Sequence, residues 1–126
     1  PAFLQNHIFQ MVDAVGASNA DKALKLYNEL IELKEAPSYI LYMLIRHFNI
    51  LLQISSLGGA AKNEIAAKIG ISPYFVGNYQ RQAAGFKREQ LKNALESSLD
   101  TEQKFKTGIL DDQIGVELLI VGLVSR

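Results

Sequence analysis

Apolar residues recur at helical intervals through most of the chain. The first segment shows this spacing, with Gly16 where a helix would end; its apolar residues are Ile8, Phe9, Val12 and Val15. Comparable segments, each opened by residues that favour a helix start, extend to the end of the sequence. They predict helices at about 6–15, from 19 until the proline at 37, and at 37–57, 62–69, 73–84, 87–106 and 111–124. The predicted fold class is therefore all-α, a single helical bundle of about six to seven helices.

The segment 37–57 is the most apolar and is apolar around most of its circumference. Its apolar residues are Ile40, Leu41, Met43, Leu44, Ile45, Phe48, Ile50, Leu51, Leu52 and Ile54. A helix of this kind is buried from several sides, so we expect it to be the central post of the bundle. Arg46, His47, Asn49 and Gln53 interrupt the apolar run, which argues against a membrane span.

The last apolar run, 116–124, is ambiguous from pattern alone. It is rich in β-branched residues and has the length of a buried strand. We predict a helix because no other segment offers a strand for it to pair with. No repeat and no long linker divides the chain, so we expect one helical domain over 1–126, with residues 1–5 as linker. Because Pro1 stands in place of an initiator Met, we expect a C-terminal fragment of a longer polypeptide.

Composition narrows the classes of function. Apolar residues make up 48% of the 126 residues before glycine is counted. This is slightly rich, because the usual ~45–50% already includes glycine. The chain has no cysteine, which excludes a disulfide framework, a thiolate zinc site and a cysteine nucleophile, and fits a cytoplasmic protein. Its net charge is zero, with 13 basic and 13 acidic residues. That balance argues against a strongly basic nucleic-acid binder.

No set of residues predicts catalysis. The two histidines, His7 and His47, are far apart in sequence and belong to no metal-binding motif. The acids Glu29, Glu32 and Glu35 have the spacing of a solvated helix face, and no glycine-rich phosphate loop occurs. The Lys-Thr-Gly sequence at 106–108 resembles a catalytic motif, but the chain does not contain the other motifs that such a site needs. We therefore expect no catalytic, cofactor-binding or metal-binding residues, and no small-molecule substrate.

The strongest local pattern, at 64–82, is typical of a helix-turn-helix. Ala66 is small where two helices would cross, and Gly70 can adopt the left-handed turn between them. The expected seam consists of Ile65, Ile69, Val76 and Tyr79. The stretch 62–92 has six basic and two acidic residues, a net charge of +4.

The second of these two helices is poorly suited to read DNA. Its first turns offer Pro73, Tyr74, Phe75 and Gly77 instead of the polar side chains that contact bases and phosphates. An exposed Tyr-Phe pair favours a protein contact. The candidates for a weak DNA contact are Arg81, Lys87 and Arg88.

Several short motifs follow one another over roughly 6–124. They are Ile8-Phe9 with Asp13-Ala14, Ala23-Leu24 with Leu30, Pro37 to Leu52 with Arg46 and Phe48, Glu64-Ile65-Ala66 with Gly70 and Val76, and Lys104, Thr107-Gly108 and Glu117-Leu118. In this order and spacing, they resemble the C-terminal collar domain of the delta subunit of the bacterial DNA polymerase III clamp loader. The chain departs from the pattern at His47, where Gln is common, and at Gly58-Gly59, which lengthens a loop. Gly115 and Gly122 are expected to loosen the last helix.

The resemblance implies an assembly module of the clamp-loader collar type. In that family the collar domain packs against the collar domains of neighbouring subunits, while other domains open the clamp and hydrolyse ATP. It implies partners among the other clamp-loader subunits, with DNA contacted only indirectly or weakly. Candidate interface residues are Tyr74, Phe75, Leu118 and Val121.

Three other hypotheses remain. The first alternative is a helix-turn-helix DNA-binding domain of a regulator, the second is a scaffold for an unknown partner, and a small-molecule enzyme is the most distant. The charges separate along the chain in a way that favours assembly: 96–117 has two basic and six acidic residues, a net charge of −4, opposite to the +4 of 62–92. Opposite patches could orient neighbouring subunits.

Overall fold

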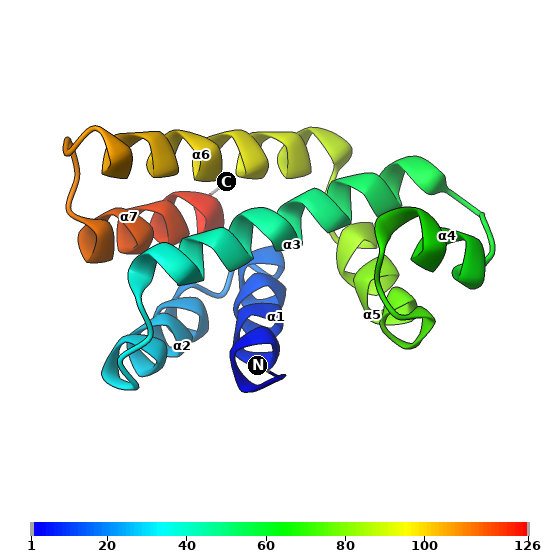
Figure 1. The fold of residues 1–126 in the computed structure, drawn as a ribbon, viewed down its shortest axis with the longest axis horizontal. Coiled ribbons are helices and arrows are strands. Elements are labelled where there is room, and N and C mark those ends of the chain that lie inside the picture. Colours follow the sequence, from blue (N-terminus) through cyan, green and yellow to red (C-terminus); the bar gives the residue numbers. More distant parts are fainter. Residues whose placement is uncertain (1, 126) are drawn as a thin grey trace.

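The computed structural model describes residues 2–125, which form seven helices and no strand. The helices are α1 (Ala2–Gly16), α2 (Ala20–Glu32), α3 (Pro37–Leu57), α4 (Lys62–Ile69), α5 (Pro73–Ala84), α6 (Arg88–Lys106) and α7 (Asp112–Val124) (Figure 1). The all-α prediction is confirmed, including the choice of a helix for the run 116–124. The core draws buried residues from all seven helices.

Helix starts follow local side-chain chemistry that was readable in the sequence. The side chain of Asn19 accepts a hydrogen bond from the Lys22 backbone N–H at 3.2 Å. Ser72 caps α5 in the same way, and Asp111 caps α7. Such caps satisfy backbone N–H groups that have no partner inside the helix. These three boundaries therefore depend on a few neighbouring residues and not on the rest of the fold.

Helix α3 is the central element. It packs against α1, α4, α5, α6 and α7, and Figure 1 shows it running diagonally through the whole molecule. By length and composition alone it could cross a membrane, but half of its most apolar window is buried inside the protein. Five neighbouring helices thus explain why α3 is apolar around most of its circumference, as expected for a central post.

Helix α1 begins earlier than the sequence pattern indicated. Residues 1–5 were expected to be a linker, yet the helix starts at Ala2 and Leu4 is only 1% exposed. Leu4 lies one turn before Ile8, which is equally buried, so the buried face of α1 simply continues through its first turn. The linker prediction is therefore wrong for residues 2–5, and Pro1 lies outside the described residues.

Helix α7 is continuous through both of its glycines. The expectation that Gly115 and Gly122 loosen it is wrong, because Gly115 is buried where α7 lies close to Phe105 of α6. A Cβ at this position would lie 2.4 Å from the Phe105 ring and 2.9 Å from Leu110. Gly115 is therefore the residue that allows the two helices to approach this closely.

Helices α4 and α5 form the predicted helical corner. Gly70 follows α4 with φ of 84°, the left-handed conformation that glycine adopts without strain. Ile65 and Val76 are fully buried in the seam, with Ile69 and Tyr79 partly buried beside them. The corner packs on the C-terminal half of the molecule's central helix, at the opposite end from α2 and α7 (Figure 1).

Candidate functional site

Helix α7 carries an apolar face that no other helix covers. Its inner face is buried through Val116 and Ile120. On the outside, Ile114, Leu118 and Val121 follow one another at intervals of four and three residues and are 55%, 55% and 40% exposed. Such spacing places the three side chains in one stripe along the helix, which we call the α7 stripe. Contiguous exposed apolar surface of this kind marks an interaction site.

A groove runs beside the α7 stripe, between α6 and α7. Its volume is about 520 Å³, and Leu118 belongs to both the groove and the stripe. Ile109, in the loop before α7, lines the same groove and is 73% exposed. Gly122 of α7 also lines this groove; it is exposed and has no side chain, so the helix backbone there is accessible to a partner. The α6–α7 groove is thus open, apolar and continuous with the stripe.

The two aromatic residues predicted for a partner contact lie elsewhere. Tyr74 and Phe75 stand in the first turn of α5, and their rings meet edge to face at 5.2 Å. Tyr74 is 83% exposed, the most exposed of the large apolar residues. Because α5 and α7 lie at opposite ends of α3 (Figure 1), the four predicted interface residues form two separate surfaces.

Phe75 borders a second groove, which we call the α1–α5 groove. It has a volume of about 690 Å³ and lies between the N-terminal half of α1 and the start of α5, with α3 beside them. Its residues are Phe3, Gln5, Asn6 and Phe9 of α1, Arg46 of α3, Gly70, Ile71 and Ser72 of the turn, and Phe75, Asn78 and Tyr79 of α5. Sequence reasoning missed this groove because its walls are more than 60 residues apart in the chain and no local pattern joins them.

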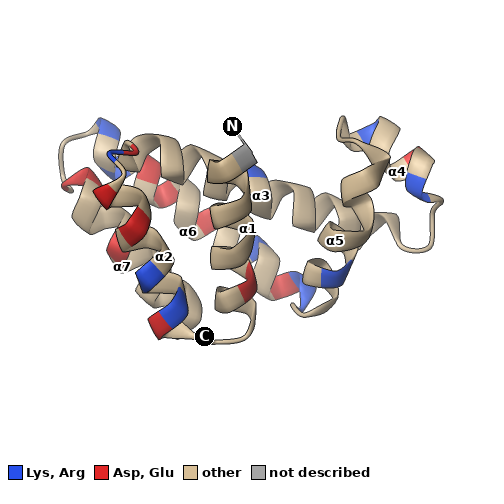
Figure 2. Cartoon of the chain, turned by 90° about the horizontal axis from the view of Figure 1, so that it is seen from below, with Lys and Arg blue, Asp and Glu red and all other residues tan. Residues whose placement is uncertain are grey.

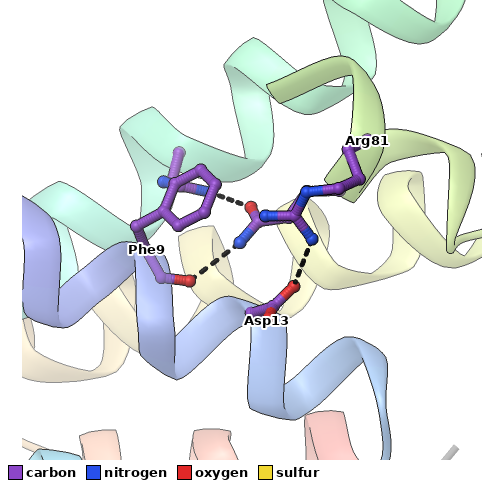
Figure 3. A network of polar contacts seen from close by, with 5 residues as sticks. Phe9, Asp13 and Arg81 are labelled. Carbon is purple, nitrogen blue, oxygen red and sulfur yellow. Dashed lines mark hydrogen bonds and ion pairs between the residues drawn. The ribbon is translucent and has the colours of Figure 1, made fainter. Parts of the chain in front are cut away.

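A buried polar network fixes α1, α3 and α5 to one another behind this groove (Figure 3). The Gln82 side-chain nitrogen donates to the Phe9 carbonyl at 2.8 Å. The Gln82 oxygen is therefore the acceptor for His47 Nε2–H, 2.6 Å away. Both side chains are buried. Burial lowers the pKa of His47 to about 4, with the Gln82 hydrogen bond opposing this shift and the nearby Arg46 charge adding to it. The neutral imidazole is therefore the form of His47 that this buried site and its hydrogen bond to Gln82 accommodate.

The three candidates for DNA contact are placed differently from one another. Arg81, on α5, forms an ion pair with Asp13 of α1 at 3.3 Å and lies over the Phe9 ring (Figure 3). Lys87 caps α6 and Arg88 begins it, and both side chains are exposed. The helix that would read DNA bases therefore has its one arginine engaged in a contact within the protein.

Charge is distributed unevenly over the surface. Seen from below in Figure 2, acidic residues gather at the α2, α6 and α7 end, and basic residues predominate on α4 and α5. Lys104 and Lys106 at the acidic end are paired with Asp100 and Glu102 of the same helix. This leaves an acidic surplus around the start of α7. Within residues 2–125, no group of three or more His, Asp or Glu side chains is placed to hold a metal ion.

Comparisons with known proteins agree with this architecture. The family model of the DNA polymerase III delta subunit, C-terminal domain, matches residues 5–123. The chain is 25% identical over 125 residues to DNA polymerase III subunit delta of Bacillus subtilis (strain 168), covering 98% of this chain and 36% of that protein. It also matches the solved structure of the Bacillus subtilis DNA clamp loader delta protein (YqeN), with a TM-score of 0.91 and 25% identity, covering 98% of this chain and 37% of the other.

The chain therefore spans little more than a third of the length of these two proteins. The resemblance read from the sequence is confirmed, and the clamp-loader collar type of helical bundle with it. The helix-turn-helix regulator is not favoured, because the whole chain, and not the α4–α5 corner alone, matches one family. The chain belongs to the family of the C-terminal domain of the DNA polymerase III delta subunit.

Proposed function

We propose that this chain is the assembly, or collar, module of a clamp-loader delta subunit. In this role it holds together the complex that loads the sliding clamp during DNA replication. Family membership and the likeness to a clamp loader delta protein support the proposal. The observation that carries it is the α7 stripe, a row of large apolar side chains beside an open groove.

The proposed contact is a helix of a neighbouring collar domain lying along α7. Its apolar side chains would enter the α6–α7 groove and cover Leu118 and Val121, which is the helix-in-groove mode of recognition. Full burial of a Leu side chain contributes about 1.5–3 kcal/mol, so covering the exposed half of Leu118 contributes roughly 1 kcal/mol. Several such residues together give a stable contact.

Charge around the stripe indicates what the partner surface carries. Asp111, Asp112 and Glu117 are exposed next to the stripe, so a basic rim on the partner would fit it. The basic α4–α5 end of this chain would then face a different neighbour, as in a head-to-tail ring contact. In this proposal the partners are the other clamp-loader subunits, contacted through their collar domains.

The proposal assigns no catalytic step, cofactor, metal or small-molecule substrate to this chain. It acts in the cytoplasm, and DNA is contacted only indirectly or weakly, with Lys87 and Arg88 as the accessible cations. Tyr74 remains a proposed partner-contact residue, because a ring that is 83% exposed has no role in the core. These statements follow from the assembly role and are tested with it.

The test is co-elution of this chain with the collar domains of the other clamp-loader subunits from the same organism. Leu118→Lys in the stripe should weaken the association at least about tenfold, because it removes apolar burial and places a charge in the contact. Leu99→Lys on α6 is the matched control, since Leu99 is 45% exposed and lies outside the groove.

Two results would reject the assembly role. One is a wild-type chain that elutes alone at every concentration tested. The other is a full-length parent protein that still assembles normally after this domain is deleted. Equal weakening by both Leu→Lys variants would keep the assembly role but remove the α7 stripe as its contact.

A further inference from the structure

Arg46 is a cation without a partner. It lies on α3 in the wall of the α1–α5 groove and is partly buried. Among residues 2–125, its guanidinium forms neither a hydrogen bond nor an ion pair, although it carries five N–H donors. Because no buried side-chain nitrogen within residues 2–125 lacks a hydrogen-bond partner, the unpaired guanidinium nitrogens of Arg46 are accessible from solvent. A partly buried, unpaired arginine at the edge of a groove is therefore placed to receive an anion.

Among the described residues that line the groove around Arg46, the polar side chains are uncharged and none is acidic. Among the described residues that line the α1–α5 groove, Arg46 is the one charged side chain. Asp13, the one acidic residue of α1 and α5, is already paired with Arg81. Phe3 and Phe75, on opposite walls, are 53% and 47% exposed and leave aromatic surface uncovered. Arginine and aromatic side chains are enriched among the hot-spot residues of protein interfaces.

The groove is held in shape by the network behind it. Gln82 joins α5 to α1 through the Phe9 carbonyl and to α3 through His47. Because both walls are fixed to α3, a ligand would meet a groove that is already formed. Preformed sites lose less entropy on binding than mobile ones.

We propose that the α1–α5 groove binds a short acidic segment of a partner protein. A carboxylate of that segment pairs with Arg46, and a bulky apolar side chain beside it packs between Phe3 and Phe75. This surface shares no residue with the α7 stripe or with the α6–α7 groove. The proposal therefore stands or fails independently of the contact assigned to collar assembly.

A peptide fits the groove better than the two other anionic ligands. Single-stranded nucleic acid is bound along a positively charged track, whereas the described residues of this groove include one cation, Arg46. A small molecule is normally enclosed over most of its surface, whereas the two phenylalanine walls are about half exposed to solvent. One carboxylate next to one apolar anchor is the chemistry that a peptide supplies.

The test uses the 126-residue chain and a panel of blocked tetrapeptides with one Asp or Glu beside Phe, Tyr or Leu. A matched panel carries Asn or Gln in place of the acid, and a twelve-residue oligothymidine serves as the nucleic-acid probe. Binding is followed by chemical shifts of backbone amides, with Gly70, Ile71 and Asn78 as reporters in the groove. We expect acidic peptides to shift these amides and to bind about tenfold more tightly than their amide counterparts.

Substitutions test separately how the charge of Arg46 and the apolar surface of Phe75 contribute to peptide binding. Arg46→Met keeps the apolar stem and should weaken acidic peptides about tenfold while leaving the amide panel unchanged. Arg88→Met removes an exposed charge outside the groove and should change neither. Phe75→Ala removes an exposed wall and should weaken both panels without affecting the fold.

Four results would overturn the proposal. They are the absence of binding by every acidic peptide, equal affinity for acidic and amide peptides, undiminished binding to Arg46→Met, and groove shifts caused by oligothymidine but not by peptides. The comparison of the two panels on the wild-type chain does not depend on any variant folding correctly.

Discussion

Protonation of His47 should destabilise this domain in mild acid. The imidazole is 4% exposed, and burial lowers its folded-state pKa to about 4 from 6.5. A group whose pKa is lowered by folding stabilises the folded state above its unfolded pKa. This stabilisation is lost as the pH falls from 6.5 towards 4, because the unfolded chain then binds a proton that the folded chain excludes.

The size of this effect follows from the two pKa values. A difference of one pKa unit corresponds to about 1.4 kcal/mol, so the complete loss is about 3 kcal/mol. About 2 kcal/mol of this loss is expected between pH 7.5 and pH 5. Carboxylates change their charge less in this range than they do below pH 5. The expected loss is a considerable share of the ~5–15 kcal/mol by which a domain is usually stable.

The assay is urea unfolding at pH 7.5 and pH 5, followed by circular dichroism, for the wild type and for His47→Gln. Glutamine cannot be protonated here, yet its amide can still donate to the Gln82 side-chain oxygen. The variant should therefore lose about 2 kcal/mol less free energy of unfolding between the two pH values than the wild type. The carboxylates are common to both proteins, so the difference isolates His47.

This reasoning is refuted if the free energy of unfolding changes between the two pH values by the same amount in both proteins, to within the error of about 0.5 kcal/mol of the urea extrapolation. It would mean that His47 keeps an ordinary pKa in the folded state, and hence that water reaches the imidazole. A constant offset between the two curves reports only the cost of the substitution itself, and the test depends on the difference in their pH dependence.

Three further substitutions test the packing of α7. Gly115→Ala places a Cβ 2.4 Å from the Phe105 ring and should lower the free energy of unfolding by about 1 kcal/mol. The new Cβ of Gly122→Ala meets no other atom, and this variant should raise the free energy of unfolding by about 0.5 kcal/mol through helix propensity. Thermal unfolding of both variants checks that the two effects have opposite signs. Tyr27→Phe removes the hydroxyl that donates to the Gln113 carbonyl at 2.7 Å, and should lower the free energy of unfolding by about 1 kcal/mol in urea. A Tyr27→Phe variant as stable as wild type would show that water replaces this bond.

The candidate surfaces were only partly accessible to sequence reasoning. Leu118 and Val121 could be named in advance because the run 118–124 of α7 is apolar around the helix, which is more apolar surface than one bundle can cover. Tyr74 and Phe75 could be named because they open a helix whose buried residues lie further along. Arg46 could not be recognised as unpaired, because the absence of a nearby carboxylate depends on which helices surround it.

The charged residues likewise divide into what the sequence predicts and what only the folded structure decides. The sequence contains the separation into a basic stretch and an acidic one, and Figure 2 shows the two at different ends of the molecule. That Arg81 is engaged with Asp13, 68 residues away, and that Arg88 is free could not be read from the stretch 62–92 itself. Net charge along the chain therefore predicted a surface property, and only the folded contacts decided which cations remain available.

The sequence by itself determined where the helices after α1 begin and end, because helix formation depends on neighbours within four residues: apolar spacing, the caps Asn19, Ser72 and Asp111, and the stop at Gly70. Tertiary structure decided what lies between the helices. The early start of α1, the close approach at Gly115 and the α1–α5 groove all arise from packing between distant segments. Such packing depends on shape and volume in three dimensions, which no local pattern in the chain records.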